Sequence, residues 1–232
     1  MESETFIIEL PGWTQLLPPN EIFGSAPNSA EASSDKQDRP LEVDLGCGKG
    51  RFILARAKAN HDTNFLGIDR LLRRLKKVNR KISREDLSNV RLLRVEASYA
   101  VEYLLPPISV STFYIFFPDP WPKRRHARRR LFTKSFLDSL HRILRPAGCI
   151  HLATDHMDYF TEICGLFGQD HRFTAVPAFL PSEEERTDFE LVFLKKEAQI
   201  NRCSFQKTEV GDPAVGGINQ KLAPPQAGSE VS

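Results

Sequence analysis

Seven residues in the first quarter of the chain combine one carboxylate with three glycines at alternate positions. The run reads Asp44-Leu45-Gly46-Cys47-Gly48-Lys49-Gly50, and two further acids, Asp69 and Glu96, follow later apolar segments. Glycine permits positive φ and lets a ligand approach the backbone, and a carboxylate can accept hydrogen bonds from both adjacent hydroxyls of a ribose. A plain tight turn would explain the glycines alone. The three acids together favour a site for a nucleoside-containing ligand.

The spacing of the glycines narrows the choice of ligand. It is G-x-G-x-G, whereas a dinucleotide site uses G-x-G-x-x-G to seat a pyrophosphate at a helix N-terminus. Asp44 lies inside the turn, where an acid is unfavourable beside a pyrophosphate but suits a sulfonium or an α-amino group. These features favour S-adenosylmethionine over NAD. Glu42 shares a face of the predicted strand with Asp44 but lies further from the turn, so Asp44 is the preferred candidate.

A second chemical feature is a proline-bounded acid followed by a dense run of cations. Asp119 lies between Pro118 and Pro120, and prolines fix φ, so the carboxylate is presented on a stiff loop. The arginines that could bind phosphates are Arg124, Arg125, Arg128, Arg129 and Arg130. A solvated face would also explain such a run. Its place beside the predicted cofactor turn favours a nucleic-acid backbone, bound in a salt-dependent manner.

These residues need a scaffold that brings the ends of several segments to one edge. Apolar runs predict strands over 41–45, 64–68, 90–95, 111–117 and 149–153, with later strands over 173–176 and 189–194. Apolar residues at helical spacing predict helices over 52–58, 71–82, 100–105, 132–144 and 159–167. Five repeats of strand and helix predict an α/β fold with a doubly wound, mostly parallel sheet of seven strands and helices on both faces.

Three stretches of the sequence resemble the bacterial tRNA (guanine-N7-)-methyltransferase family, a branch of the Rossmann-like methyltransferases. They are residues 42–50, residues 65–69 and, most specifically, Phe117-Pro118-Asp119-Pro120-Trp121-Pro122-Lys123-Arg124-Arg125-His126. Residues 153–155 and 186–190 are similar to the family's two later substrate motifs. The resemblance spans about residues 40–196 and leaves both ends of the chain unexplained.

The resemblance implies a role for each matching position. The expected cofactor-binding residues are Asp44, Gly46, Gly48, Gly50, Asp69, Glu96, Ala97 and Asp119, and Asp119 is also the expected catalytic residue. The expected substrate-binding residues are Lys123, Asp155, Thr187, Asp188, Phe189 and Glu190. The sequence departs from the family pattern after Glu190, where Leu191 and Val192 replace the usual Arg and Gly. That departure bears on how the target base is held.

The resemblance implies methyl transfer from S-adenosylmethionine to N7 of a guanine in tRNA, expected to be guanine 46 of the variable loop. N7 carries an in-plane lone pair and no proton, so in-line displacement needs alignment rather than a general base. The sequence has no evident Ser-His-Asp or nucleophilic-cysteine constellation, which agrees with such a reaction. Methylation of another RNA or of a small molecule, and a non-catalytic RNA-binding subunit, remain alternatives.

Composition bounds the remaining possibilities. The 232 residues carry 32 Lys and Arg against 30 Asp and Glu, a formal net charge of +2. A value near zero does not exclude RNA, because it does not say where the charges lie. No apolar run approaches the roughly 18 residues of a membrane helix, the N-terminus lacks signal-peptide features, and the four cysteines form no C-x-x-C pair. We expect a cytoplasmic protein, monomeric or homodimeric, with tRNA as its partner and without a metal or a membrane.

Changes in composition and in apolar periodicity along the chain predict its division into segments. Residues 1–39 read as a flexible N-terminal arm and residues 40–197 as the S-adenosylmethionine-dependent methyltransferase domain. Residues 198–232 are rich in Gln, Pro, Gly and Ser, which predicts a disordered C-terminal tail.

Overall fold

The computed structural model describes residues 5–10, 12, 15–24 and 39–208, except for the side chains of residues 124 and 127. The strands are β1 (Ile7–Ile8), β2 (Leu41–Leu45), β3 (Asn64–Ile68), β4 (Val90–Leu93), β5 (Val110–Phe116), β6 (Leu144–Thr154), β7 (Phe173–Val176) and β8 (Asn201–Lys207). The α-helices are α1 (Pro19–Gly24), α2 (Arg51–Ala59), α3 (Leu72–Glu85), α4 (Ala97–Tyr99), α5 (Lys134–Ile143), α6 (Met157–Gly168) and α7 (Asp188–Leu194). A π-helical turn (Ala100–Leu104) continues α4, and a 3-10 helix (Arg124–Arg129) lies between β5 and α5.

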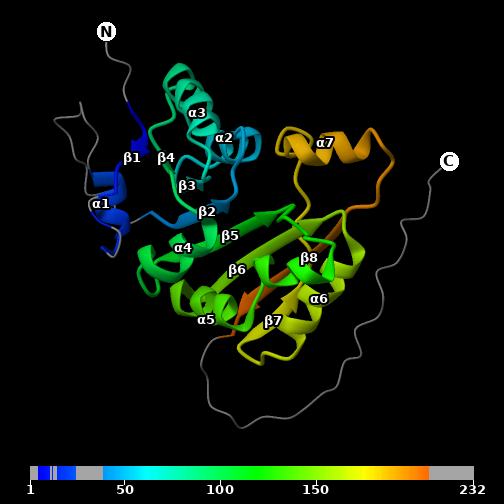
Figure 1. Ribbon diagram of the computed structural model, residues 1–232. Coiled ribbons are helices and arrows are strands. Elements are labelled where there is room, and N and C mark those ends of the chain that lie inside the picture. Colours follow the sequence, from blue (N-terminus) through cyan, green and yellow to red (C-terminus); the bar gives the residue numbers. More distant parts are fainter. Residues whose placement is uncertain (1–4, 11, 13–14, 25–38, 209–232) are drawn as a thin grey trace.

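The strands form one sheet in the order β1-β4-β3-β2-β5-β6-β8-β7 (Figure 1). The pairings of β8 with β6 and with β7 are antiparallel, and the other pairings are parallel. The strand order reverses between β2 and β5, which places a topological switch point at the carboxyl end of β2, where doubly wound sheets bind ligands. The predicted fold class is confirmed, and β1 adds an eighth strand at one edge.

Two apolar cores lie on the two faces of the sheet. One joins the buried sides of α2 and α3 to the strands through Ile53, Leu54, Leu75, Val78, Ile82, Phe65 and Leu92. The other joins α5, α6 and the π-helical turn to the opposite face through Leu104, Phe136, Leu140, Ile163, Val43, Phe113 and Ile115. Figure 1 shows α2 and α3 together on one side of the sheet and α5 and α6 on the other. The stripe predicted for residues 71–82 is thus the buried side of α3, and the apolar run in β5 lies at the centre of the sheet.

The prediction of a flexible arm over residues 1–39 is wrong for the described part of that segment. Phe6 is buried, its backbone N–H donates to Asn79 Oδ1 at 2.7 Å, and β1 pairs with β4. Ile22 and Phe23 of α1 are buried in the core. Apolar side chains that cover the sheet edge therefore order this segment. Residues 25–38 of the predicted arm lie outside the described residues.

Two late elements also differ from prediction. Residues 189–194, predicted as a strand, belong to helix α7 because Thr187 caps the helix: its Oγ1 accepts a hydrogen bond from the backbone N–H of Glu190 at 3.0 Å. Residues 201–207, predicted to lie in a disordered tail, form β8 between β6 and β7. Pairing with a strand on each side stabilises β8. The composition of residues 198–232 gives no information about such pairing, so the strand was not predicted. Residues 209–232 lie outside the described residues.

Candidate active site

A cavity of about 710 Å³ lies where the carboxyl ends of β2, β3, β4 and β5 meet. Five of the predicted cofactor-binding residues line it, namely Gly46, Asp69, Glu96, Ala97 and Asp119. Arg128, Arg129, Arg130 and Phe189 line it as well. The fold therefore brings residues that are up to 144 positions apart, from Leu45 to Phe189, around one space.

The glycine turn after β2 owes its shape to backbone conformation. Gly46, Gly48 and Gly50 have φ of 87°, 57° and 77°, values that disfavour a side chain. No atom lies within 4 Å of a Cβ built at Gly46, which faces the cavity, whereas a Cβ at Gly50 would lie 2.6 Å from a Val78 methyl. Gly46 thus leaves space for a ligand, while Gly50 allows α2 to begin close against α3. Gly48 and Gly50 do not line the cavity.

Asp69 is held in place at the end of β3 by three donors. Its carboxylate accepts hydrogen bonds from the backbone N–H groups of Gly48 at 3.1 Å and Leu71 at 2.8 Å, and it pairs with Arg74 at 3.2 Å. The carboxylate therefore ties the glycine turn to the start of α3. Since each oxygen has two lone pairs, acceptor capacity remains for a ligand hydroxyl.

Asp44 is a buried acid that lacks a partner. It is 6% exposed, does not line the cavity although Leu45 and Gly46 beside it do, and has no hydrogen-bond or ion-pair partner among the described residues. Burial, together with the nearby charge of Asp69, raises the pKa of Asp44 from 3.8 to about 8. A buried carboxyl that is left unpaired is costly. A cation bound beside it would lower that cost.

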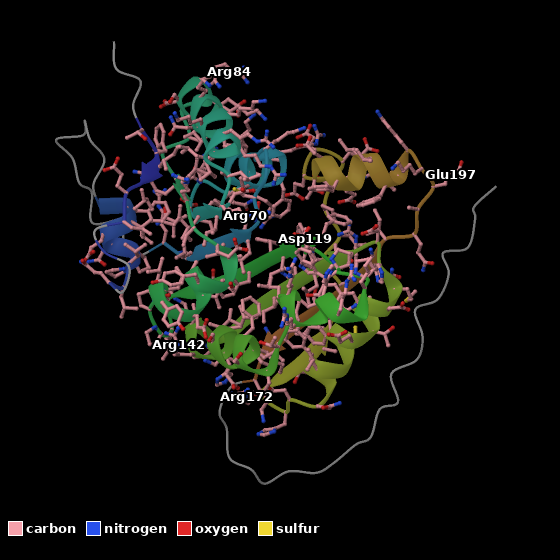
Figure 2. All side chains as sticks on the ribbon, in the orientation of Figure 1. Arg70, Arg84, Asp119, Arg142, Arg172 and Glu197 are labelled. Atoms are coloured by element: carbon pink, nitrogen blue, oxygen red, sulfur yellow. The ribbon has the colours of Figure 1, made fainter. Side chains whose placement is uncertain are left out.

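Asp119 lies on a loop that strained backbone and local contacts hold rigid. The residues that flank its proline-rich segment, Phe117 and Trp121, have φ of 53° and 42° although neither is glycine, and such residues persist only where surrounding contacts fix them. The Phe117 N–H donates to the Ala153 carbonyl at 2.7 Å. The Asp119 carboxylate is exposed and has no partner in the described part of the chain. Figure 2 shows Asp119 near the centre of the molecule.

The cationic run after Asp119 divides into two groups. Arg130 is half-buried: its Nε donates to the Pro120 carbonyl at 2.9 Å, its Nη1 pairs with Glu162, and its guanidinium lies over the Tyr159 ring. Arg130 therefore fastens the loop to α6, a role that the sequence did not predict. Arg129 lies over the Trp121 ring, 4.9 Å from its centroid.

The other cations of this run are free of such contacts. Lys123, Arg125 and Arg128 are exposed and have no ion-pair partner among the described residues. Of these three, Arg128 lines the cavity. The side chain of Arg124 lies outside the described structure. The exposed cations are thus available to an anionic ligand, and Arg128 is available at the cavity itself.

The later substrate motifs contribute unequally to the site. Phe189 is 52% exposed and lines the cavity, and its ring lies 6.4 Å from that of Phe117. Glu190 is 5% exposed and pairs with Arg202 of β8 at 2.5 Å, so its contact in this structure is internal. Thr187 caps α7. Asp155 is exposed just after β6, and like Lys123, Thr187, Asp188 and Glu190 it does not line the cavity.

Some cavity residues were not among the predicted site residues. Arg70 and Leu71 line it from just before α3 and Arg74 from the first turn of that helix, while the N-cap Thr133 and Ser135 and Ser139 of α5 supply hydroxyls. The sequence could have pointed to Arg74, because it lies in the first turn of the helix that follows Asp69. In the described structure no helix has the length and apolar character to cross a membrane, and no three His, Cys, Asp or Glu residues there gather as a metal site would need.

Comparison with known proteins identifies the family. The model of a family described as "putative methyltransferase" matches residues 38–206. Proteins named tRNA (guanine-N(7)-)-methyltransferase are similar to the chain: that of Rubrobacter xylanophilus is 38% identical over 136 residues (58% of this chain, 60% of that protein) and that of Nitrosococcus oceani is 36% identical over 170 residues (72% and 71%). That of Streptococcus pyogenes is 42% identical over 132 residues (57% and 62%). The matched part therefore spans about three fifths of the length of two of these relatives.

Solved structures agree on the fold. The 16S rRNA methyltransferase KamB has a TM-score of 0.57 at 15% identity, covering 75% of this chain and 91% of that one. The antibiotic-resistance methyltransferase Kmr has a TM-score of 0.54 at 17% identity, covering 76% and 91%. At such identities the likeness concerns the fold alone. The family is shown by the match of the family model over residues 38–206 and by the Nitrosococcus relative. The chain therefore belongs to the tRNA (guanine-N(7)-)-methyltransferase family.

Proposed function

We propose that this protein transfers a methyl group from S-adenosylmethionine to N7 of a guanine in tRNA, guanine 46 of the variable loop, in the cytoplasm. The observation that carries the proposal is the position of Asp119. Its carboxylate, which has no partner among the described residues, stands on a rigid loop over the same cavity as Gly46, Asp69 and Glu96. The relatives named as tRNA (guanine-N(7)-)-methyltransferases support the choice of substrate.

The residues present fit S-adenosylmethionine. Asp44 is a buried carboxyl with no partner among the described residues, and a sulfonium or α-ammonium group would supply the missing positive charge. Gly46 opens the backbone to the cavity, and Asp69 and Glu96 end neighbouring strands, where carboxylates can accept hydrogen bonds from ribose hydroxyls. Asp44, Gly46, Gly48, Gly50, Asp69, Glu96, Ala97 and Asp119 are the residues we assign to this cofactor.

When held by these residues, S-adenosylmethionine would supply a methyl group on positively charged sulfur to the N7 lone pair, and the C–S electron pair would return to sulfur. No proton moves, so the chain needs no general base. The rigid loop that carries Asp119 limits the positions from which the purine can approach, which is catalysis by alignment. Positive charge passes to the purine during the step, and a fixed carboxylate at the cavity stabilises that charge as it develops.

Recognition of the base falls to residues with free acceptors and exposed rings. Asp119 and Asp155 are exposed carboxylates that can accept hydrogen bonds from the N1–H and the 2-amino group of guanine, leaving N7 unobstructed. Phe189 offers a ring at the cavity against which the base can stack. Glu190 acts through Arg202 in holding α7, and Thr187 and Asp188 start that helix. Lys123 and the exposed arginines bind phosphates.

The proposal is tested by incubating the purified protein with labelled S-adenosylmethionine and a tRNA transcript. We expect label at a single guanine, and none when that guanine is replaced by 7-deazaguanine, which lacks N7. Label on ribosomal RNA and none on tRNA would refute the assignment in favour of another RNA substrate. Asp119→Asn should lower kcat by about 100-fold or more. The control Asp62→Asn changes an exposed acid just before β3, at the end of that strand away from the cavity, and should leave kcat unchanged. Equal rates in these two variants would remove Asp119 from the mechanism.

A further inference from the structure

Helix α3 presents a row of cations to solvent. Its buried side consists of Leu75, Val78, Asn79 and Ile82. The opposite side carries the exposed side chains Arg73, Lys76, Lys77, Arg80 and Arg84. At 1.5 Å per residue, the row from Arg73 to Arg84 is about 16 Å long.

Few acids neutralise this row. Arg84 pairs with Glu85, and Arg80 donates to the backbone carbonyl of Lys76. Within the described part of the chain, no carboxylate pairs with Arg73, Lys76 or Lys77. The charge of this surface is therefore open to a partner.

The arrangement works against the helix itself. Like charges four residues apart, as in Arg73 and Lys77 or Lys76 and Arg80, destabilise a helix. The first turn holds no acid and the helix has no side-chain N-cap, although acids are the residues that suit that end. A sequence selected only for the stability of α3 would place acids among these cations.

The row is continuous with the cavity. Arg70 and Arg74, at the start of α3, line the cavity, while Arg128 and Arg129 line it from the loop after β5. Figure 2 shows Arg70 at the end of α3 that faces Asp119 and Arg84 at the far end of the helix. A polyanion bound at the cavity would thus meet cations from two separate elements, and along α3 it would meet them for several further residues.

We infer that the exposed row of α3 is a second contact surface for the backbone of the substrate tRNA, separate from the cations of residues 123–130. The inference rests on the proposed function. A membrane surface does not fit, because the apolar side of α3 is buried in the core and cannot enter lipid. A row of exposed cations along one helix face, most of them without a carboxylate partner among the described residues, suits the successive phosphates of a nucleic-acid strand, which it can contact without reading sequence.

Two matched lysine pairs in the full chain test the inference. Lys76→Gln/Lys77→Gln removes two charges from the row, and Lys195→Gln/Lys196→Gln removes two from an exposed adjacent pair beyond α7. The affinity for tRNA transcript is measured between 50 and 200 mM salt, together with methylation kinetics. The salt slope falls by about 0.9 for each lost phosphate contact. We therefore expect the first variant to bind tens of fold more weakly at 0.1 M salt, with a slope smaller by about 2, a raised KM for tRNA and an unchanged kcat.

The control pair should behave as the wild type does. If the Lys76 and Lys77 variant binds tRNA with the affinity and salt slope of the control, the α3 surface is not an RNA contact and the inference is wrong. Retention by both variants of the wild-type affinity for S-adenosylmethionine verifies that each is folded. A wild-type protein that transfers no methyl group to tRNA would instead overturn the proposed function, so the two failures are distinguishable.

Discussion

Replacement of the buried Asp44 by Asn gives a direct test of the cofactor site. Burial and the charge of Asp69 raise the pKa of Asp44 to about 8, so at pH 7 about nine-tenths of the ligand-free molecules hold a proton there. A cation bound next to the carboxyl favours its ionised form and lowers that pKa. Binding of S-adenosylmethionine at pH 7 should therefore release about 0.9 protons from Asp44.

The affinity then depends on pH in a defined direction. Because the logarithm of the association constant rises with pH in proportion to the protons released, the Kd should fall by about eightfold per pH unit around pH 7. The dependence should level off above pH 8, where the carboxyl is already ionised in the free protein. Asp44→Asn should weaken binding and abolish both the proton release and the slope.

Titration calorimetry in buffers of different ionisation enthalpy measures the released protons. The ligand's own amino group can also titrate, so the quantity to compare is the difference between the wild type and Asp44→Asn. A variant that releases as many protons as the wild type would show that Asp44 does not face the cation. Equal affinity at every pH would refute the electrostatic account of the buried carboxyl.

The pH dependence of the stability of the ligand-free protein provides a second test of the raised pKa of Asp44. A raised folded-state pKa means that the folded state binds more protons than the unfolded state between pH 4 and 8, so stability is lost as pH rises through that window. His151 has its pKa lowered by burial to about 4, which acts in the opposite direction below pH 6.5. Between pH 6.5 and 7.5, Asp44→Asn should therefore remove a decline of about 1.2 kcal/mol per pH unit.

Two further predictions concern the framework of the site. Gly50→Ala should lower the free energy of unfolding by about 2–4 kcal/mol, because it adds a Cβ at positive φ and 2.6 Å from Val78. The control is Gly165→Ala, in α6, where a Cβ would meet open space. That variant should raise the free energy of unfolding by about 0.5–1 kcal/mol. Urea denaturation measures both, and equal effects would contradict the packing argument. Arg202→Gln should cost about 3–5 kcal/mol because it leaves Glu190 buried without its close partner, and adding Glu190→Gln should restore most of that loss. A stable double variant that cannot methylate tRNA would show instead that Glu190 contacts the substrate.

The sequence was most informative where local pattern and tertiary burial coincide. Strands 41–45 and 64–68 were predicted with the bounds that β2 and β3 have, because short apolar runs bounded by turn residues are buried on both faces of a parallel sheet. The acids at the ends of such strands could be placed together for the same reason, since parallel strands end at one edge. Asp69, Glu96 and Asp119 accordingly meet at the cavity.

The failures have two different physical causes. Helix α7 was missed although its start follows the capping pattern of Thr187 with Glu190 three residues later; the apolar run after it outweighed that signal. β8 could not be found from its own residues, because its stability comes from pairing with β6 and β7. The role of Glu190 depends on the same strand: Arg202, which neutralises it, lies on β8. An error in one distant strand therefore concealed the internal role of a motif residue.

The near-neutral charge of the chain conceals which cations can reach a ligand. Arg56, Arg130, Arg172 and Arg202 are all engaged with carboxylates of the fold, so their charges are already compensated. Lys76, Lys77, Arg125 and Arg128 are exposed and have no such partner among the described residues. A net charge of +2 counts both groups equally, whereas phosphates respond to the local potential, which only the uncompensated cations raise. Affinity for RNA in this fold should therefore follow the number of unpaired cations around the cavity and along α3, and substitutions that change the net charge elsewhere should leave it unaltered.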